Sequence, residues 1–297
     1  MTAPVALGVA DESARLTHVV MGTGAGFHRD QARVTIANST EARTAAETGL
    51  PTAAAVTAQF QAFRQAMEQH GVTVHQPVLA PDSVQDQTCP RDIGFVIGDA
   101  FVTAGMRQPG RLEEIAGLAR LLPNLAGRQL AVPDGMALEG GDVLLDRGHL
   151  FVGQGQRSDP DGLAWLQAEF GEQWQIVSMP TRWAEADADV LHLDCAFNPL
   201  GLGHALIYPP GLKTIPDAVR AHYDWIEVDQ AEAEALATNV VSLAPDTIIA
   251  RDHPSCARVN ALLRHAGYQV IEVGFDAVPS IGGSFRCATL PLQRSAS

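Results

Sequence analysis

The chain has 297 residues, of which 46% are hydrophobic and 18% charged, and 34 acidic against 20 basic residues give a formal net charge of −14. This apolar content supports a sizeable core and excludes a largely disordered protein, while the length suits two domains or one large α/β domain. The negative charge disfavours nucleic acid and anionic membranes as partners, and it suits a small cationic partner.

The N-terminus and the cysteines bear on where the protein works. The first residues lack the positively charged start of a signal peptide, and the longest uncharged stretch, 195–212, is rich in proline and glycine, as loops are. Cys89, Cys195, Cys256 and Cys287 form no CxxC pair, which disfavours a disulfide scaffold and a zinc site. We therefore expect a cytoplasmic protein with reduced thiols and no metal or cofactor.

One pattern recurs five times along the chain: strand, tight turn, strand, helix, strand. The expected strands are, in chain order, 16–21; 93–97, 101–104 and 129–132; 143–145, 150–152 and 175–179; 190–197, 205–208 and 225–228; 239–243, 247–250 and 268–273. The expected helices are 52–70, 111–122, one over 159–171, a short one after 216, and 254–266. The pattern predicts an α/β fold made of ββαβ repeats.

The pattern is clearest in the third unit and looser in the first, where one strand precedes the helix. Four apolar residues of the helix 52–70 recur at helical spacing and predict one buried face: Val56, Phe60, Phe63 and Met67. Asp159 is placed to cap the third unit's helix, with Pro160 at its first position.

Units that recur about every 47 to 53 residues are typical of quasi-symmetric assemblies. We therefore expect one domain over residues 1–297 in which the five units close into a ring. Asp92, Glu139, His192 and Asn239 each begin the first strand of a unit, at spacings of 47, 53 and 47 residues. Ring symmetry would bring them together around one axis. Polar residues gathered there predict a negatively charged pocket that suits a cation with several N–H donors.

Four segments, CPRDIGFVIGD, LEGGDVLL, HLDCAFNPLG and IGGSFRCATLPL, resemble the four signatures of the guanidino-group-modifying enzymes, in the same order, over about residues 89–292. This superfamily comprises arginine deiminases, dimethylarginine dimethylaminohydrolases, agmatine deiminases and amidinotransferases. The resemblance implies the pentein fold, a five-bladed pseudo-symmetric α/β propeller. It also implies a small guanidino compound as the substrate.

The resemblance implies a role for five residues. Cys287 matches the nucleophile, His192 the general acid/base and Glu139 its carboxylate partner, while Asp92 and Asp194 match the guanidinium-binding acids. The chemistry suits these residue types, because a guanidinium carbon resists attack by water and a thiolate must first form a covalent intermediate. We interpret the other three cysteines as small buried residues.

Further arginines are candidates for holding a substrate carboxylate, a role that arginine performs as a bidentate donor. In deiminases such arginines grip the α-carboxylate, and Arg157 is the closer match, whereas Arg107 and Arg111 would serve nearly as well in surface salt bridges. Arg286 directly precedes the nucleophile, as in arginine deiminases, where such an arginine covers the empty site.

Within the superfamily the signals divide between a hydrolase and an amidinotransferase. Short dimethylarginine hydrolases usually carry lysine where this chain has Asp194, and amidinotransferases usually carry aspartate in place of Glu139. We favour a hydrolase of arginine-like guanidines and keep amidino transfer as the alternative. A pentein-fold binding factor is the non-enzyme alternative, although the complete set of catalytic residue types disfavours it. The oligomeric state, including a homo-oligomer, stays open.

Overall fold

The computed structural model describes residues 4–28, 35–185 and 188–295. Within these residues five three-stranded sheets share one design, in which the middle strand pairs antiparallel with one neighbour and parallel with the other. Their strands are β17 (Thr289–Ser295), β2 (Arg15–Met21) and β3 (Thr73–His75); β4 (Gly94–Ile97), β5 (Ala100–Thr103) and β7 (Arg128–Ala131); β8 (Val143–Asp146), β9 (His149–Gln154) and β10 (Gln175–Pro180); β11 (Phe197–Pro199), β12 (His204–Ile207) and β13 (Asp224–Glu227); β14 (Val241–Ala244), β15 (Thr247–Arg251) and β16 (Gln269–Val273). The predicted α/β repeats are therefore confirmed.

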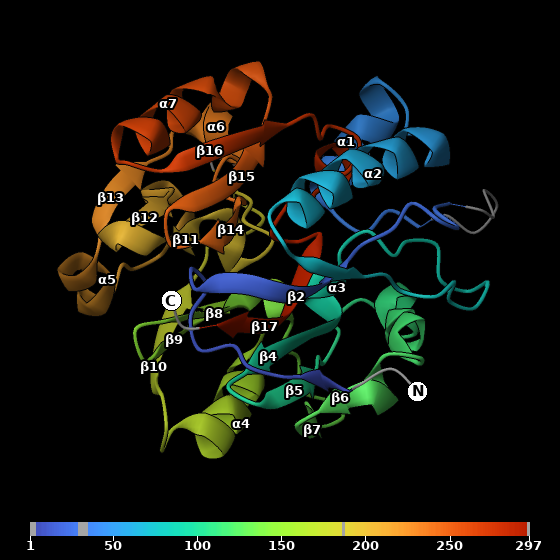
Figure 1. Cartoon of the computed structure of the whole chain (residues 1–297), viewed down its shortest axis with the longest axis horizontal. Coiled ribbons are helices and arrows are strands. Elements are labelled where there is room, and N and C mark those ends of the chain that lie inside the picture. Colours follow the sequence, from blue (N-terminus) through green and yellow to red (C-terminus); the bar gives the residue numbers. More distant parts are fainter. Residues whose placement is uncertain (1–3, 29–34, 186–187, 296–297) are drawn as a thin grey trace.

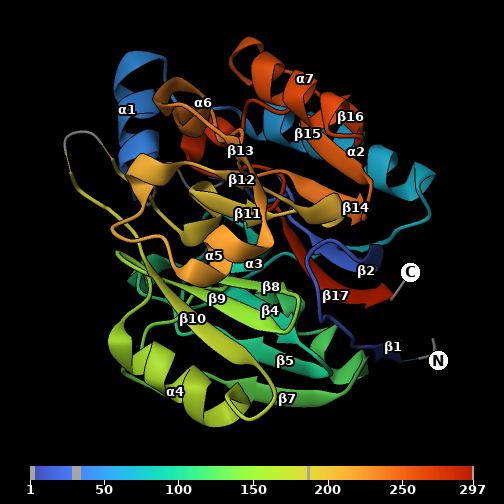
Figure 2. The ribbon, with the colours of Figure 1, turned by 90° about the vertical axis from the view of Figure 1, so that its left-hand side faces the viewer.

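Apart from the short, fully buried α3 near the middle of the molecule, the helices lie outside the sheets, with α4 and α7 on opposite sides (Figures 1 and 2). They are α1 (Ser39–Glu47), α2 (Ala53–Gln69), α3 (Pro90–Ile93), α4 (Pro160–Phe170), α5 (Asp217–His222), α6 (Gln230–Glu234) and α7 (Ala257–His265). Asp159 caps α4 as predicted, because its side chain accepts a hydrogen bond from the backbone N–H of Gly162. The predicted apolar face of α2 is buried.

The predicted helix over 111–122 is wrong. Three short 3₁₀ turns replace it, at Pro109–Arg111, Glu114–Leu118 and Leu122–Asn124. Proline cannot donate a backbone hydrogen bond, and a Cβ on Gly117 would lie 2.4 Å from the Gln87 side chain, so this segment is held by close packing that a regular helix does not allow.

The predicted strand over 190–197 begins too early, since β11 starts at Phe197 and a 3₁₀ turn occupies Leu193–Cys195. The backbone N–H of Leu193 donates to the Asp142 side chain at 2.8 Å instead of to a neighbouring strand. Asp92, Glu139, His192 and Asn239 likewise precede their strands β4, β8, β11 and β14 rather than belonging to them. Asp92 is thus carried on the short helix α3, and the other three lie on turns or irregular segments that lead into an apolar strand.

The first unit is completed by the other end of the chain. Strand β17 pairs antiparallel with β2, with Ser295 opposite Arg15 and Thr289 opposite Met21 (Figure 1). The two-stranded sheet of β1 (Val5–Ala6) and β6 (Leu125–Ala126) adds a contact between the N-terminal segment and the second unit. Only one residue separates Cys287 from β17, so the pairing of β17 with β2 also fixes the position of the predicted nucleophile.

The apolar core of the described residues forms three clusters between neighbouring units. Phe60 and Phe275 belong to one of them, Phe95 and Leu166 to the second, and Phe197 to the third. Each fully buried side chain of this size stabilises the fold by roughly 1.5–3 kcal/mol. No helix among the residues described is long and apolar enough to cross a lipid bilayer.

Candidate active site

The predicted acid/base group is buried between two carboxylates. His192 Nε2 donates a hydrogen bond to Glu139 Oε2 at 2.8 Å, and His192 Nδ1 lies 3.7 Å from Asp92 Oδ1. Burial alone would lower the pKa of His192, but the charge of Asp92, the hydrogen bond to Glu139 and the charge of Asp142 together raise it to about 10. The imidazole is therefore protonated at neutral pH.

Glu139 is itself fully engaged by protein groups. Its Oε1 accepts the backbone N–H of Arg107 at 2.9 Å, and its Oε2 also lies 3.4 Å from Arg157 Nη1. Both carboxylate oxygens are used, so Glu139 orients His192 and leaves no oxygen free for a substrate.

The turns that carry these residues interlock behind the histidine. Asp142 accepts the backbone N–H of Leu193 at 2.8 Å and the Ser158 hydroxyl at 2.6 Å, and the backbone N–H of Glu139 donates to that hydroxyl. A Cβ on Gly141 would lie 2.6 Å from His192 Cγ, so only glycine allows the turn to approach the ring this closely. Asp142 therefore ties the turn before β8 to the turn that carries His192.

Cys287 lies beside Asp194 and Asn239, with 2% of its surface exposed. Its Sγ is 3.8 Å from Asp194 Oδ2 and 4.0 Å from Asp194 Oδ1. The backbone N–H of Cys287 donates to Asn239 Oδ1 at 3.1 Å, and Asn239 Nδ2 donates to the carbonyl oxygen of Asp194 at 3.4 Å. Asn239 thus holds the backbone of both the predicted nucleophile and the predicted guanidinium-binding acid.

Each predicted guanidinium-binding acid has one oxygen held by an arginine. Arg111 Nη1 donates to Asp92 Oδ2 at 2.6 Å, and Arg286 Nη1 donates to Asp194 Oδ2 at 2.8 Å. Burial raises the pKa of Asp92, but the charges of His192 and Arg111 outweigh it and lower this pKa below its usual value. Asp92 Oδ1 and His192 Nδ1 are buried without a hydrogen-bond partner among the described residues. Unpaired buried polar atoms of this kind are expected where a ligand supplies the missing partner.

A cavity of about 400 Å³ reaches this cluster from the surface. Asp92, Arg111 and Arg157 line it, together with Cys89, whose thiol was predicted to be buried but lies in the wall. Arg157 is 1% exposed, and its Nη2 donates to the carbonyl oxygen of Ala37 at 2.9 Å. Its Nε has no partner within the described parts of the chain.

The remaining predicted arginines lie elsewhere. Arg107 is half-exposed and pairs with Asp159 at 3.3 Å, outside the lining of the cavity. Arg286 is buried behind Asp194 and also donates to Glu12 Oε1 and to the Val143 carbonyl oxygen, at 2.8 and 3.0 Å. Glu12 and Glu114, which bonds Arg111 at 2.7 Å, were missed because neither lies in a signature segment.

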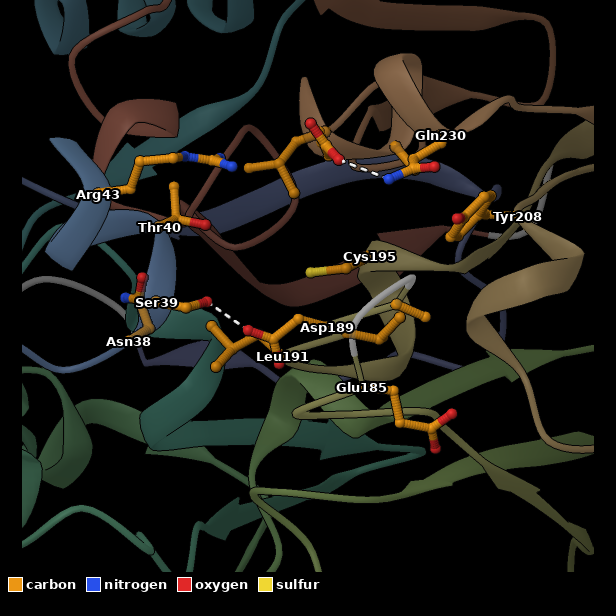
Figure 3. A pocket seen from close by; sticks show the side chains of 16 residues that line it. Asn38, Ser39, Thr40, Arg43, Glu185, Asp189, Leu191, Cys195, Tyr208 and Gln230 are labelled. Carbon is orange, nitrogen blue, oxygen red and sulfur yellow. Dashed lines mark hydrogen bonds between the residues drawn. The ribbon is translucent and has the colours of Figure 1, made fainter. Parts of the chain in front are cut away.

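A second pocket, of about 270 Å³, is lined by Cys195, the residue that follows Asp194. Figure 3 shows Cys195 between Thr40 and Arg43 of α1 and the side chains of Tyr208 and Gln230. The Cys195 thiol lies 3.6 Å from Asp194 Oδ1. Asn38, Leu191 and Gly282 line both pockets and thus form the wall between them.

The buried group around His192 also has the composition of a metal-ion site. Asp92, Glu139 and His192 each place one candidate ligand atom within 4.8 Å of the others. The proton that these carboxylates hold on His192 competes directly with a metal ion for the ring nitrogens. All four cysteines, which fall inside the described ranges, are free thiols.

The sequence matches the family described as N,N dimethylarginine dimethylhydrolase, eukaryotic, over residues 29–294. Among similar proteins, the uncharacterised protein YkgA of Bacillus subtilis is 37% identical over 241 residues, covering 80% of this chain and 79% of YkgA. The N(G),N(G)-dimethylarginine dimethylaminohydrolase of Mycobacterium tuberculosis is 27% identical over 230 residues, covering 75% and 70% of the two chains.

Solved structures share the fold over nearly the whole chain. SxtG, an amidinotransferase from Microseira wollei, superposes with a TM-score of 0.78 at 18% identity and covers 98% of both chains. The N-terminal domain of ArgZ, an arginine dihydrolase from cyanobacteria, superposes with a TM-score of 0.77 at 22% identity, covering 93% and 97%. At these identities the likeness establishes the α/β fold and leaves the reaction open.

Proposed function

The chain belongs to the N,N dimethylarginine dimethylhydrolase family, and from this premise we propose that it hydrolyses arginine-like guanidines. Arginine or a methylated arginine would give citrulline and ammonia or an amine. The observation that carries the proposal is the buried cluster around Cys287, in which an ionised Asp92 and a protonated His192 each have one atom without a partner. A guanidinium ion supplies N–H donors for the unpaired carboxylate oxygen.

We also propose that the five sheets are the blades of one pentein propeller in a single domain over residues 1–297. Their shared strand design and the closing of the first unit by β17 support this arrangement. The convergence of Asp92, Glu139, His192 and Asn239 on one site supports it independently.

Binding would place the guanidinium between the two aspartates. Asp92 Oδ1 and Asp194 Oδ1 are the oxygens that arginines do not hold, so each can accept an N–H of the substrate. Charge-assisted bonds of this kind are short and directional, and two of them would hold the guanidinium carbon in line with Cys287. Arg111 and Arg157, both in the wall of the cavity, are the candidates to bind a carboxylate at the other end of the substrate.

The chemistry would proceed in two halves. The Cys287 thiolate adds to the guanidinium carbon, and His192 donates its proton to the departing nitrogen as the carbon–nitrogen bond breaks. Ammonia or an amine leaves, and a cationic thiouronium remains on sulfur. The now neutral His192 then takes a proton from water, whose oxygen attacks the same carbon. The carbon–sulfur bond then breaks and its electron pair returns to Cys287 as the thiolate, while the remaining O–H proton passes to solvent and the neutral urea is released.

A panel of guanidines tests the proposal. Wild-type protein should release a ureido product from arginine or a methylated arginine, and mass spectrometry of a quenched reaction should find the adduct on Cys287. Cys287→Ser should bind substrate without turnover, because the carboxylates remain in place. An adduct on Cys89, Cys195 or Cys256 would contradict the assignment of the nucleophile, and an unaffected Cys287→Ala would favour a binding role.

Amidino transfer is the second candidate. The fold that this chain shares with SxtG over 98% of both chains is the observation that favours it. Transfer would use the same thiouronium and differ only in the group that removes it from Cys287.

A further inference from the structure

Glu12 lies on the segment between β1 and β2, far from every signature segment of the chain. Its backbone N–H donates to the carbonyl oxygen of Leu145 at 2.8 Å, and the residue is only 4% exposed. Its Oε1 accepts Arg286 Nη2 at 2.8 Å and lies 3.5 Å from Arg91 Nη1. Burial raises the pKa of Glu12, but the charges of Arg286, Arg91 and Arg294 outweigh it and lower the pKa to about 2. Glu12 is therefore ionised at every pH at which the protein would work.

Arg286 joins this buried glutamate to the proposed guanidinium-binding acid. One end of its guanidinium, Nη1, donates to Asp194 Oδ2, and the other, Nη2, donates to Glu12 and to the Val143 carbonyl oxygen. The arginine is 1% exposed and Asp194 is fully buried. Both Nη groups are thus committed to fixed partners, and the guanidinium plane is held in one orientation. Arginine takes only Oδ2 of Asp194, and Oδ1 lies 4.0 Å from the Cys287 thiol and 3.6 Å from the Cys195 thiol.

The charges around Arg286 determine what happens without Glu12. Arg286 and Arg91 are both buried, and the side-chain Nε of Arg91 lies 3.4 Å from the Arg286 carbonyl oxygen. Removing Glu12 leaves three buried cations, Arg286, Arg91 and Arg294, without this acid. It also frees the N–H of Arg286 Nη2 that Glu12 accepted, while the bond from Nη2 to the Val143 carbonyl oxygen remains. Asp194 is the remaining carboxylate that Arg286 already touches, so the freed donor would turn toward it and take the oxygen that a substrate needs.

We infer that Glu12 is a positioning residue: it holds Arg286 so that one oxygen of Asp194 stays free for the cationic substrate. The inference rests on the proposed function, because it takes Asp194 as the acid that binds the guanidinium. It also gives Arg286 a role inside the protein, behind the site, in place of the cover expected from the sequence.

Alkylation of Cys287 tests the inference without turnover. Chloroacetamidine is a cationic amidine, and chloroacetamide is its neutral counterpart of nearly the same shape; with either, sulfur bonds to the CH₂ carbon and chloride leaves. The ratio of the two rate constants, followed by peptide mass spectrometry at Cys287, measures recognition of a cation beside the thiol. Glu12→Gln should lower this ratio roughly tenfold or more, the scale of one charge-assisted hydrogen bond. Glu12→Asp, which keeps the charge, should recover most of the ratio.

Glu232→Gln is the matched control. Glu232 is also a buried glutamate paired with an arginine, Arg258, but it caps α6 outside the site. It should lower the melting temperature and leave the alkylation ratio unchanged. If Glu12→Gln destabilises the protein equally without changing the ratio, Glu12 is merely structural and the inference is wrong. Should Glu12→Gln fail to fold, Arg286→Lys provides the same test, because lysine cannot donate to both acids as a planar fork.

The two proposals fail in different ways. A wild-type protein that prefers chloroacetamidine but forms no ureido product would contradict hydrolysis and leave the role of Glu12 intact. A wild-type protein that reacts equally with both reagents would overturn the guanidinium site and, with it, this inference. Where substrate is turned over, Glu12→Gln should raise KM more than it lowers kcat, since it removes a binding oxygen and leaves His192 in place.

Discussion

At the scale of single residues, the proposal assigns guanidinium binding to two aspartates, Asp92 and Asp194. Each gives its Oδ2 to an arginine, and its Oδ1 lies 3.7 Å from His192 Nδ1 in Asp92 and 4.0 Å from Cys287 Sγ in Asp194. Asp92→Asn or Asp194→Asn replaces a charged acceptor with a neutral amide, which costs about 1.5–3 kcal/mol for each charge-assisted bond lost. We expect kcat/KM for the best guanidine to fall by about ten- to a hundredfold in each variant, with both KM and kcat affected because the carbon is misplaced as well. Glu272→Gln, in a surface pair with Arg264, is the control; unchanged kinetics in both aspartate variants would place the cation elsewhere.

Protonation of His192 leads to a second prediction, which concerns the pH dependence of the free energy of unfolding. Its pKa in the folded protein, about 10, lies above the ordinary value of 6.5, so the folded state keeps a proton that the unfolded state releases. The resulting stabilisation is complete below pH 6.5 and is lost as the pH rises toward 10, and its size is of the order of a few kcal/mol. In urea unfolding, wild type should exceed His192→Gln in free energy of unfolding by an amount that shrinks over this range. A difference that stays constant with pH would mean that the ring is neutral.

The site residues that lie in the four signature segments could be predicted from the sequence. Cys287, His192, Glu139, Asp92 and Asp194 lie in signature segments, and the structure brings all five together. Glu12 could not be predicted, since a single glutamate in the N-terminal segment shows its role only when β17 brings Arg286 beside it.

At the scale of elements, the site depends on turns that precede strands. A 3₁₀ turn at Gly140–Asp142 packs directly under the His192 ring. Gly141→Ala would add a Cβ 2.6 Å from His192 Cγ and 2.8 Å from Nδ1, so the ring must move away from Glu139 or Asp92. We expect kcat to fall by about a hundredfold, the scale of a misplacement near 1 Å. Gly274→Ala is the matched control, because its Cβ would meet no atom within 4 Å. Equal activity of the two variants would show that the turn does not position the histidine.

These same turns mark the limit of sequence-based prediction at this scale. Periodicity located β8, β9, α4 and α2 closely, because their hydrophobic patterns and caps are local. The same reasoning began strand β11 too early, at 190, because apolar residues alternate across His192 and Leu193. The backbone N–H of Leu193 instead donates to the side chain of Asp142. Local pattern cannot report a partner 51 residues away.

At the scale of the whole molecule, the two chain ends form one sheet. Strand β17 pairs with β2, from the other end of the chain (Figure 2). This pairing brings Cys287 to Asp194 and Asn239. The repeat predicted five units but left the first incomplete, since its missing strand lies at the opposite end of the sequence. Contacts between segments so far apart in the sequence form at a high entropic cost, and no local sequence pattern predicts them.

At the same scale, hydrolysis and amidino transfer differ in one measurable step. Both reactions pass through a thiouronium on Cys287, so detection of the adduct cannot separate them. They differ in what removes the adduct: water activated by His192, or an acceptor amine that enters after the first product leaves. We expect water to act, because Glu139 holds His192 beside the unpaired oxygen of Asp92, where the imidazole is the proposed base for water.

With arginine or a methylated arginine as the sole substrate, citrulline and ammonia or an amine should therefore accumulate steadily. Their linear release over many turnovers is the expected result, measured by amino-acid analysis. An amidinotransferase would instead give little product until glycine, lysine or another amine was added, and would then release ornithine with a new guanidine. Cys287→Ser, which should form neither product, controls for a contaminating activity. Ornithine that appears only with an added amine would replace hydrolysis by transfer, and it would leave the fold, Cys287 and the role of Asp194 unchanged.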